Sequence, residues 1–433
     1  MNRRLFIILF AVASIIGVSI IVWYFFFKTN TGSLLFGTPT NPFGKTPPSL
    51  RGSEFVNGNN GYGTSSQTER TLGADRTLVK VWDRPTAGFS FIEKEFITTS
   101  TTTDKQGKVI TVQKKATSTE MLFADRTTGY IYDYDIKNQN IYQITNTLTA
   151  GIYDIYFFNN GKSAIIRYLS DDKKTIISNL VQIPTVSASS SPQEIKTNVY
   201  LPNNIISITP NYNSTELSYL VKTSSGSNLY TLTTKGSKLI KSFQLSELNV
   251  LYDKNNLYVY NKPSIYALGF LYDVKNNENI LSKTVALSPL VSHNGQNVMG
   301  SFWSESSSNN FMFNKSTASM RSLSIYTPEE KCVWNNKDTF VLCGVTPVIF
   351  NKKEGLPDDW YKGRVSFDDS IYMIDNVGKR EYDFFDFTAE TSDKIDLTKP
   401  KISNNDELLG FINKKDGSFW MFKVKKTLDN VYD

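Results

Sequence analysis

Apolar residues fill Leu5–Phe27 without interruption, whereas the rest of the chain alternates apolar and polar positions over short distances. As a helix, this run would extend about 34 Å at roughly 1.5 Å per residue, enough to cross a bilayer core of about 30 Å. Arg3 and Arg4 precede the run and Lys28 follows it. Because basic residues favour the cytoplasmic side, the pattern predicts a transmembrane signal anchor over residues 1–28, with a cytoplasmic N-terminus.

A cleaved signal peptide is the alternative interpretation of this run. Signal peptides have an apolar region of about 7–15 residues followed by a small-residue cleavage site. Ala11-Val12-Ala13 has the required small residues but lies inside the run, which ends in the bulky residues Trp23–Phe27. Such an end suits a membrane–water interface better, so we expect the anchor to be retained in the cell membrane and the remaining chain to be extracytoplasmic.

The next part of the chain, residues 29–75, is rich in Gly, Pro, Asn and Thr and shows no apolar periodicity. This composition is typical of a disordered linker, because it offers too little apolar surface to fold alone. A coil of this length would hold its ends roughly 35–40 Å apart.

From Arg76 onwards, short runs of β-branched and aromatic residues alternate with polar ones between turns of Asn, Gly, Asp and Lys. The pattern predicts strands, and no dozen residues repeat at the helical period. The clearest predicted strands are Gly129–Tyr134, Ala164–Leu169, Glu216–Val221, Leu257–Tyr260, Ser370–Asp375 and Phe419–Val424. This part of the chain therefore predicts an all-β fold.

An internal repeat indicates how the strands are grouped. Val79–Phe91 and Tyr142–Asp154 each place a Thr-Ala-Gly turn after one strand and before the next apolar run. Weaker copies begin near Ile205, Leu248, Leu287, Pro328 and Lys401. The seven units average about 51 residues over 76–433, a size typical of a four-stranded propeller blade. We therefore predict a seven-bladed β-propeller, with six or eight blades as variants and one or two β-sandwiches as the alternative.

The register of the repeat also predicts how the ring closes. Thr77–Trp82 matches the outer strand of a unit, but no inner strands precede it. It should therefore complete the last blade beside Glu407–Ile412 and Ser418–Lys423. This closure would leave no open sheet edge between the two ends of the domain.

Composition narrows the function classes. A net charge of +6, evenly mixed over 433 residues, argues against a nucleic-acid partner. One His and two Cys leave few of the residues that metal sites and imidazole catalysis use first. The sequence has no phosphate-binding glycine loop, Gly-x-Ser-x-Gly elbow or His-Glu-x-x-His pair. We therefore expect neither enzyme activity nor a cofactor.

Three Asp-Asp pairs are the remaining candidates for catalysis: Asp171-Asp172, Asp358-Asp359 and Asp368-Asp369. A propeller glycosidase or lyase needs two carboxylates across a pocket, one of them protonated. Adjacent pairs in loops are usually solvated turns, which is how we interpret these. His293 beside Asn294-Gly295 also fits a turn.

The preferred binding candidate is Leu356–Gly363. It places Asp358, Asp359, Trp360 and Tyr361 together in what should be a long blade insertion. Aromatic residues beside charges are common at interaction hot spots, and long loops on rigid scaffolds often carry function. The alternative is that Trp360 folds back and fixes the insertion to the body.

Cys332 and Cys343 flank a predicted β-hairpin. A turn centred on Lys337-Asp338 sets the two cysteines opposite each other, at a Cα separation of about 4.5 Å if the pair is not hydrogen-bonded. A disulfide can bridge that distance and persists outside the cytoplasm. The alternatives are two buried free thiols after a register shift, or a two-Cys zinc site with further ligands.

Four stretches resemble uncharacterised, membrane-anchored propeller proteins of candidate-phyla bacteria: Arg126–Asp135, Gly151–Ile176, Glu330–Val345 and Leu356–Asp375. More distantly the chain is similar to TolB-like and WD40-like periplasmic propellers, which carry a Ser-Pro-Asp-Gly-Lys turn. That turn is kept only loosely here, in Asn159–Lys162, Thr209–Tyr212 and His293–Gln296. The resemblance implies a propeller fold and carries over no activity.

Together these patterns predict a non-catalytic binding or scaffold protein of the cell envelope, anchored through Leu5–Phe27. The expected partner is another envelope protein or a surface glycan. One alternative is a carboxylate-based glycosidase or lyase, which would place two Asp or Glu side chains about 5–10 Å apart across the central pocket. The other alternative is a TolB-like assembly factor.

Overall fold

The computed structural model describes residues 76–103, 109–184, 191–211, 215–233, 236–304, 307–347 and 355–425. The chain divides into two units, Met1–Tyr62 and Gly63–Asp433, and all described residues belong to the second. The predicted anchor, Leu5–Phe27, and the predicted linker over 29–75 lie outside the described residues. Within the described part, no helix is both long enough and apolar enough to cross a bilayer.

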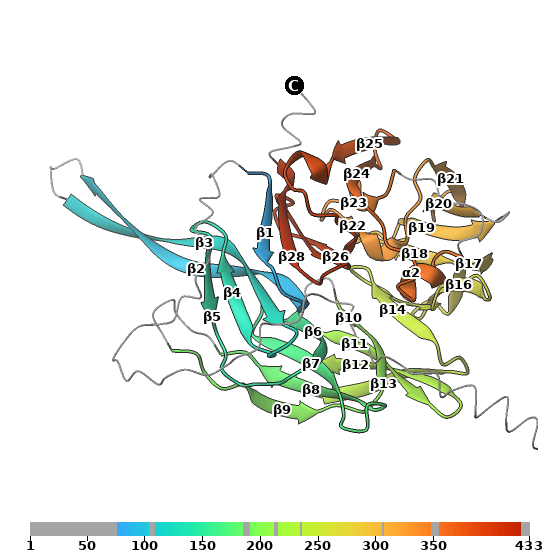
Figure 1. Cartoon of the computed structure of the whole chain (residues 1–433), viewed down its shortest axis with the longest axis horizontal. Coiled ribbons are helices and arrows are strands. Elements are labelled where there is room, and N and C mark those ends of the chain that lie inside the picture. The colour runs from blue at the N-terminus through green and yellow to red at the C-terminus, as the bar shows by residue number, and fades with distance from the viewer. Residues whose placement is uncertain are drawn as a thin grey trace, which may run out of the picture. The chain divides into compact units, whose positions relative to one another are not determined.

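The described residues form seven antiparallel sheets of four strands, the blades of a β-propeller (Figure 1). Blades 1 to 3 consist of β2 (Thr86–Thr103), β3 (Val109–Asp125), β4 (Ile131–Asp135) and β5 (Asn140–Gln143); β6 (Ile152–Phe158), β7 (Ser163–Leu169), β8 (Ile176–Gln182) and β9 (Lys196–Tyr200); and β10 (Ile205–Pro210), β11 (Leu217–Thr223), β12 (Gly226–Thr233) and β13 (Gly236–Phe243).

The remaining blades continue in chain order until the last one. Blades 4 to 6 consist of β14 (Leu248–Tyr252), β15 (Leu257–Asn261), β16 (Leu268–Asp273) and β17 (Glu278–Val285); β18 (Ser288–Val291), β19 (Asn297–Ser304), β20 (Ser307–Asn314) and β21 (Ser319–Leu323); and β22 (Cys332–Trp334), β23 (Phe340–Val345), β24 (Ser370–Asp375) and β25 (Arg380–Phe385). Blade 7 consists of β26 (Leu397–Ile402), β27 (Leu408–Asn413), β28 (Phe419–Lys423) and, as its outer strand, β1 (Leu78–Trp82).

Blade 7 joins the two ends of the propeller. β1 pairs antiparallel with β28, and Val79 lies opposite Met421. Beside this ladder, the Glu390 carboxylate accepts hydrogen bonds from the backbone N–H groups of Thr77 and Leu78 at 2.8–3.1 Å. The predicted seven blades and the predicted closure by the N-terminal strand are both confirmed.

The core lies in the layers between adjacent blades. Leu342 and Met373 of blade 6 pack with Phe411 and Phe422 of blade 7 in one such layer. Inner strands have a blade on each side, so both of their faces are covered. For this reason the four residues Phe419–Phe422 are all buried, without the exposed alternate positions of a one-sided sheet.

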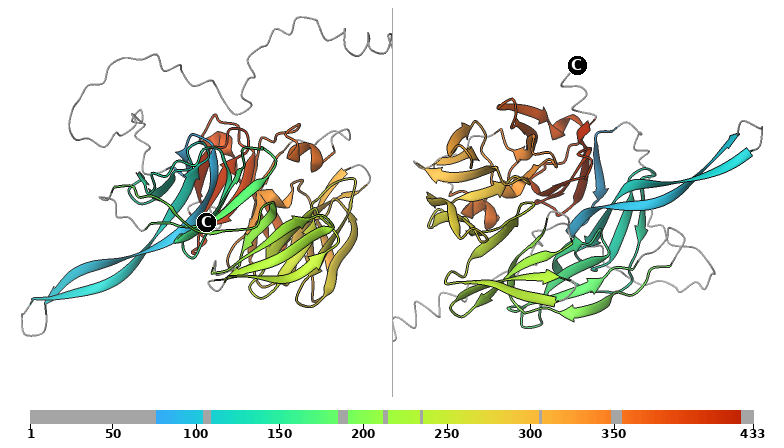
Figure 2. Two further views of the ribbon diagram at one scale, coloured as in Figure 1. Left: turned by 90° about the horizontal axis from the view of Figure 1, so that it is seen from below. Right: turned by 180° about the vertical axis from the view of Figure 1, so that it is seen from behind.

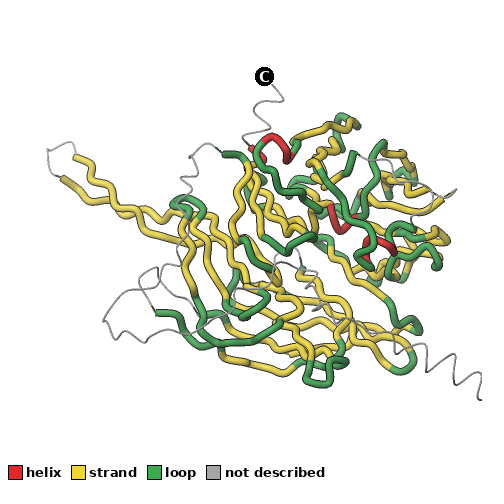
Figure 3. Tube along the Cα trace, viewed as in Figure 1, coloured by secondary structure: helices red, strands yellow, loops and turns green. Residues whose placement is uncertain are grey.

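Successive strands of a blade run in opposite directions, so its loops reach two opposite faces of the ring. Loops between second and third strands, and connections to the next blade, share one face. We call it the insertion face, because it carries the long segment 346–369 between β23 and β24. Three short helices belong to this face: η2 (Glu329–Lys331), α2 (Asp358–Tyr361) and η3 (Phe387–Ala389) (Figure 3).

The first two strands of blade 1 continue far beyond their sheet as a two-stranded arm (Figures 1 and 2). Their ladder extends to the pair Thr103–Val109, whereas β4 pairs only with Met121–Ala124. Phe96 and Ile97 on the arm are 45% and 62% exposed. The sequence patterns did not distinguish this arm, because its Thr-rich strands have no buried face that would set a regular alternation.

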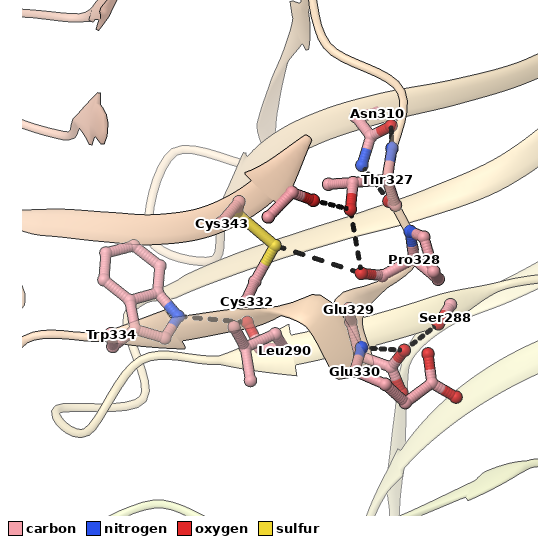
Figure 4. The surroundings of a disulfide bond; sticks show 11 residues. Ser288, Leu290, Asn310, Thr327, Pro328, Glu329, Glu330, Cys332, Trp334 and Cys343 are labelled. Carbon is pink, nitrogen blue, oxygen red and sulfur yellow. Dashed lines mark hydrogen bonds between the residues drawn. A yellow bond between two sulfur atoms is a disulfide. The ribbon is translucent and has the colours of Figure 1, made fainter. Parts of the chain in front are cut away.

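Cys332 and Cys343 face each other in the β22–β23 hairpin of blade 6 and form a disulfide (Figure 4). Their Cα atoms are 4.1 Å apart, and both residues are buried. The structure therefore contains the predicted pairing, in the predicted register. The bond holds together the two innermost strands of the blade that carries the long insertion.

Removing this disulfide with Cys332→Ala and Cys343→Ala should lower the free energy of unfolding by about 3 kcal/mol, because the bond restricts an 11-residue loop of the unfolded chain. Alanine avoids burying a hydroxyl group at either position. Denaturation in urea, compared between the oxidised protein and the double variant, measures the loss. The reduced wild-type protein is the control and should match the variant; equal stability with and without the bond would contradict the prediction.

Candidate functional site

The insertion between β23 and β24 of blade 6 is fastened to blade 4 on one side and to blade 7 on the other. In blade 4, the Ser264 hydroxyl and the Ile265 N–H donate to the Asp358 carboxylate at 2.9 and 2.8 Å. In blade 7, the Lys414 ammonium donates to the Trp360 carbonyl at 2.6 Å. The insertion therefore bridges three blades across the insertion face.

Trp360 is the buried centre of the insertion, with 3% of its surface exposed. Its Nε1–H lies 3.1 Å from both carboxylate oxygens of Asp396. The Lys414 ammonium lies 4.6 Å from the centre of its ring, and the Phe367 ring packs beside it. The Trp360 side chain thus folds back onto the body, as the alternative interpretation of Leu356–Gly363 expected.

Asp396 belongs to a buried charge network. Lys331 Nζ lies 2.7 Å from Asp396 Oδ1 and 2.7 Å from Asp369 Oδ2, and all three side chains are at most 1% exposed. Burial raises the pKa of Asp369 to about 6 although the Lys331 ammonium opposes the shift. The interpretation of Asp368-Asp369 as a solvated turn was therefore wrong for Asp369. Its neighbours in the fold, Lys331 and Asp396, are distant in the sequence, so the sequence pattern does not reveal its burial. Asp368 is 48% exposed and forms ion pairs with the exposed Lys394 and the partly exposed Lys415.

A second buried network holds the end of α2. The Tyr361 hydroxyl donates to Glu330. The Ser288 hydroxyl donates to the neighbouring Glu329, as Figure 4 shows. The Tyr260 hydroxyl donates to Glu329 Oε1 at 2.9 Å. Burial, followed by the adjacent Glu330 carboxylate, raises the pKa of Glu329 well above its usual value, which favours its protonated form. The sequence analysis did not identify Glu329 and Glu330 as functional candidates. The feature that could have indicated them is the run of charged residues directly before the inner strand β22.

A pocket of about 660 Å³ opens beside Tyr361. The blade 3–4 connection, the β15–β16 loop and the end of α2 form its walls, with Leu245, Ser246, Glu247, Asn261, Lys262, Pro263, Ser264, Ala267, Leu268, Phe270, Asp358, Tyr361 and Lys362 as lining residues. Two of the four predicted binding residues, Asp358 and Tyr361, are among them. Trp360 lines a different, smaller cavity. The Asp359 carboxylate instead accepts the Gly355 N–H at 3.0 Å.

The pocket combines exposed apolar groups with a charged rim that holds Lys262 and Lys362 as well as Glu247 and Asp358. Leu245 and Leu268 are 51% and 62% exposed, and the adjacent Tyr266 is 83% exposed. The Lys262 ammonium lies 6.0 Å from the centre of the Tyr361 ring. A bound partner could cover the two leucines. The polar and charged residues around them could then bind water or an acidic side chain of the partner.

Within the described residues, no three His, Cys, Asp or Glu side chains are grouped closely enough to hold a metal ion. His293 lies in a turn and its ring contacts Asp338, whose carboxylate Oδ1 is 2.9 Å from His293 Nδ1. Despite burial, hydrogen bonds from His293 and the Asn294 N–H lower the pKa of Asp338. This contact links the turns of blades 5 and 6 and explains the position of the single histidine.

No family model and no curated protein matches the chain. Solved structures that it resembles include the β-propeller domain of Cps50 (Swd1) from Myceliophteria thermophila. That likeness has a TM-score of 0.44 and 8% identity, and it covers 76% of this chain and 100% of that one. Such a match carries nothing about ligand or activity, and the propeller assignment rests on the strand pairing described above.

Proposed function

We propose that this protein is a non-catalytic binding module that holds a partner protein at the pocket beside Tyr361. The observation that carries the proposal is the pocket itself, in which Leu245 and Leu268 remain exposed on a rigid frame. Covering an apolar side chain of this size contributes about 1.5–3 kcal/mol, which makes such residues effective anchors for a partner. The frame is rigid because the insertion is bonded to blades on both sides.

A protein fits this pocket better than a glycan. Sugar rings are bound by exposed aromatic faces and by free hydrogen-bonding groups, whereas the aliphatic residues here outnumber the aromatic ones. The Tyr361 hydroxyl is already engaged by Glu330. Each carboxylate of the two buried networks likewise accepts a hydrogen bond from a neighbouring side chain, which favours binding over carboxylate-based hydrolysis.

We place this activity in the cell envelope, outside the membrane. The apolar run Leu5–Phe27 supports an anchor, and the Cys332–Cys343 bond fits an oxidising compartment. The binding face would then meet other envelope proteins.

A photo-reactive residue at Leu268, placed in the full chain and activated in the producing cells, should crosslink a distinct partner. The matched control is Val377, which is 73% exposed in the β24–β25 turn on the opposite face. With the purified partner, Leu268→Asp should weaken binding about tenfold or more, because it puts a charge where an apolar side chain is covered. Val377→Asp should leave the affinity unchanged. Equal crosslinking at both positions, or an unaffected Leu268→Asp variant, would overturn the proposal.

A further inference from the structure

The arm formed by β2 and β3 has a backbone edge that faces away from its own ladder. β2 is the innermost strand of blade 1, so only one of its edges pairs with β3. In an antiparallel ladder, every second residue directs both of its backbone groups away from the partner strand. Glu93 is such a residue, because its N–H donates to Asn160 Oδ1 at 2.8 Å and its carbonyl accepts from Asn160 Nδ2 at 2.7 Å. The exposed residues with the same orientation further along the arm are Glu95, Ile97, Thr99 and Thr101.

Side chains of other blades cover this edge as far as Glu93. The Phe89 carbonyl accepts a hydrogen bond from Lys401 of blade 7 at 2.6 Å. Asn160, in the β6–β7 turn of blade 2, binds Glu93 as a neighbouring strand would. Beyond Glu93, no hydrogen bond joins the outward backbone groups of β2 to any other residue that the structure describes. These groups are therefore available to a further strand.

The far part of β2 lacks the features that protect edge strands from pairing. Natural edges are kept apart by short length, bulges, proline or charged side chains, lysine above all. The β2–β3 ladder shifts its register between Thr86 and Gly88 and runs evenly from there to Thr103. Residues 96–103 contain neither proline nor a charge, whereas the other strand of the arm carries the exposed pair Lys114-Lys115. The open edge of the arm is thus that of β2.

The arm also has too few strands to be stable on its own. A two-stranded ribbon is marginally stable in water, and three or more strands with a covered face are needed. Every residue from Glu95 to Thr101 is exposed, so no part of the body supports the arm there. A second arm joined through β2 would give a sheet of four strands, the size of each blade.

The sequence of β2 is complementary to a second copy of itself. If two β2 edges pair antiparallel about Thr99, outward residues meet outward residues, with Ile97 opposite Thr101 and Thr99 opposite its own copy. These are β-branched pairs, which stabilise a ladder. The nearest charge, Glu95, falls opposite Thr103, so no like charges meet. The lysines of β3 then lie at both outer edges of the joined sheet and oppose the addition of more strands.

We propose that the arm is a dimerisation element, in which the β2 edges of two copies pair antiparallel about Thr99. The arm stands clear of the propeller (Figures 1 and 2), and residues 94–103 would extend about 34 Å at roughly 3.4 Å per residue. This length keeps the two bodies apart. The β2–β3 connection leaves the ring on the face opposite the insertion face, so the dimer keeps both pockets beside Tyr361 accessible.

Cysteine trapping in the full chain tests the register. Thr99→Cys places one cysteine of each copy at the two-fold axis, where opposed residues have Cα atoms about 5.5 Å apart, within reach of a disulfide. Mild oxidation should therefore yield a covalent dimer. Thr111→Cys is the matched control, because Thr111 is an exposed threonine on the other strand of the arm, and it should stay monomeric. Cys332 and Cys343 are bonded to each other and take no part.

Sedimentation of the unoxidised full chain in detergent measures the dissociation constant of the dimer. Thr99→Lys should raise it about tenfold or more, because two ammonium groups would face each other across the axis. Thr111→Lys should leave it unchanged. Both positions are exposed, so neither variant should alter the melting temperature. The proposal is overturned by a monomer at every concentration, by equal trapping at the two positions, by Thr99→Cys trapped with a different protein, or by a dimer that survives Thr99→Lys.

Discussion

Replacing Lys331 with methionine should lower the free energy of unfolding by about 3–5 kcal/mol at pH 8, because it leaves Asp369 and Asp396 buried without their cation. The loss should be smaller at pH 5. Burial already raises the pKa of Asp369 to about 6, and removing the ammonium raises it further. A carboxyl group with a raised pKa binds its proton more tightly in the folded state, so acid stabilises the variant relative to its unfolded chain.

Chemical denaturation of the full chain at both pH values measures this difference. The matched control is Lys394→Met, which removes a cation 2.9 Å from Asp368 at the surface. These side chains are 73% and 48% exposed, so the expected loss is at most about 1 kcal/mol at either pH. Similar losses for the two lysines, or a deficit in Lys331→Met that does not depend on pH, would show that the buried network does not stabilise the fold as described.

Val79→Asp in β1 should cost about 4 kcal/mol or more and should make the protein associate. Val79 is 4% exposed and packs in the apolar layer between blades 7 and 1, where a carboxylate has no partner. Losing β1 also uncovers the edge of β28, and an open edge strand can pair with another molecule.

Urea denaturation combined with size-exclusion chromatography separates these two effects. Lys80→Ser is the control at the next position of the same strand; Lys80 is 32% exposed in its side chain and forms a surface ion pair with Asp393. It should remain monomeric and nearly as stable as the wild type. A Val79→Asp protein that stays monomeric with wild-type stability would mean that the ring does not depend on β1 for closure.

The grouping of strands was predictable because the signals that set it are local and repeated. The Thr-Ala-Gly motif recurs at the entry to the first two blades, and Thr77–Trp82 has the pattern of an outer strand with no inner strands before it. The cysteine pairing followed in the same way, since the hairpin turn alone determines which residues face each other.

The buried networks were not predictable, because ring closure and the insertion create them. Lys331, Asp369 and Asp396 come from three separate segments, and no spacing in the sequence links them. Asp368 and Asp369 are adjacent and chemically identical, yet one is solvated and the other fully buried. The pocket was only partly predictable for the same reason, because its residues come from separate segments of the chain. Tyr361 and Asp358 were identifiable as an aromatic and acidic loop, but Leu245 and Leu268 belong to another blade.

The closure in blade 7 also determines when the protein can be completed during its synthesis. β1 is the first strand of the propeller to emerge from the ribosome, and its partner β28 is the last. Until Phe419–Lys423 has been made, the apolar residues of β1 have no sheet to join and remain accessible to chaperones and proteases. A chain that ends before β28 leaves the apolar residues of β1 unpaired and exposed. Exposure of β1 therefore distinguishes truncated chains from complete ones.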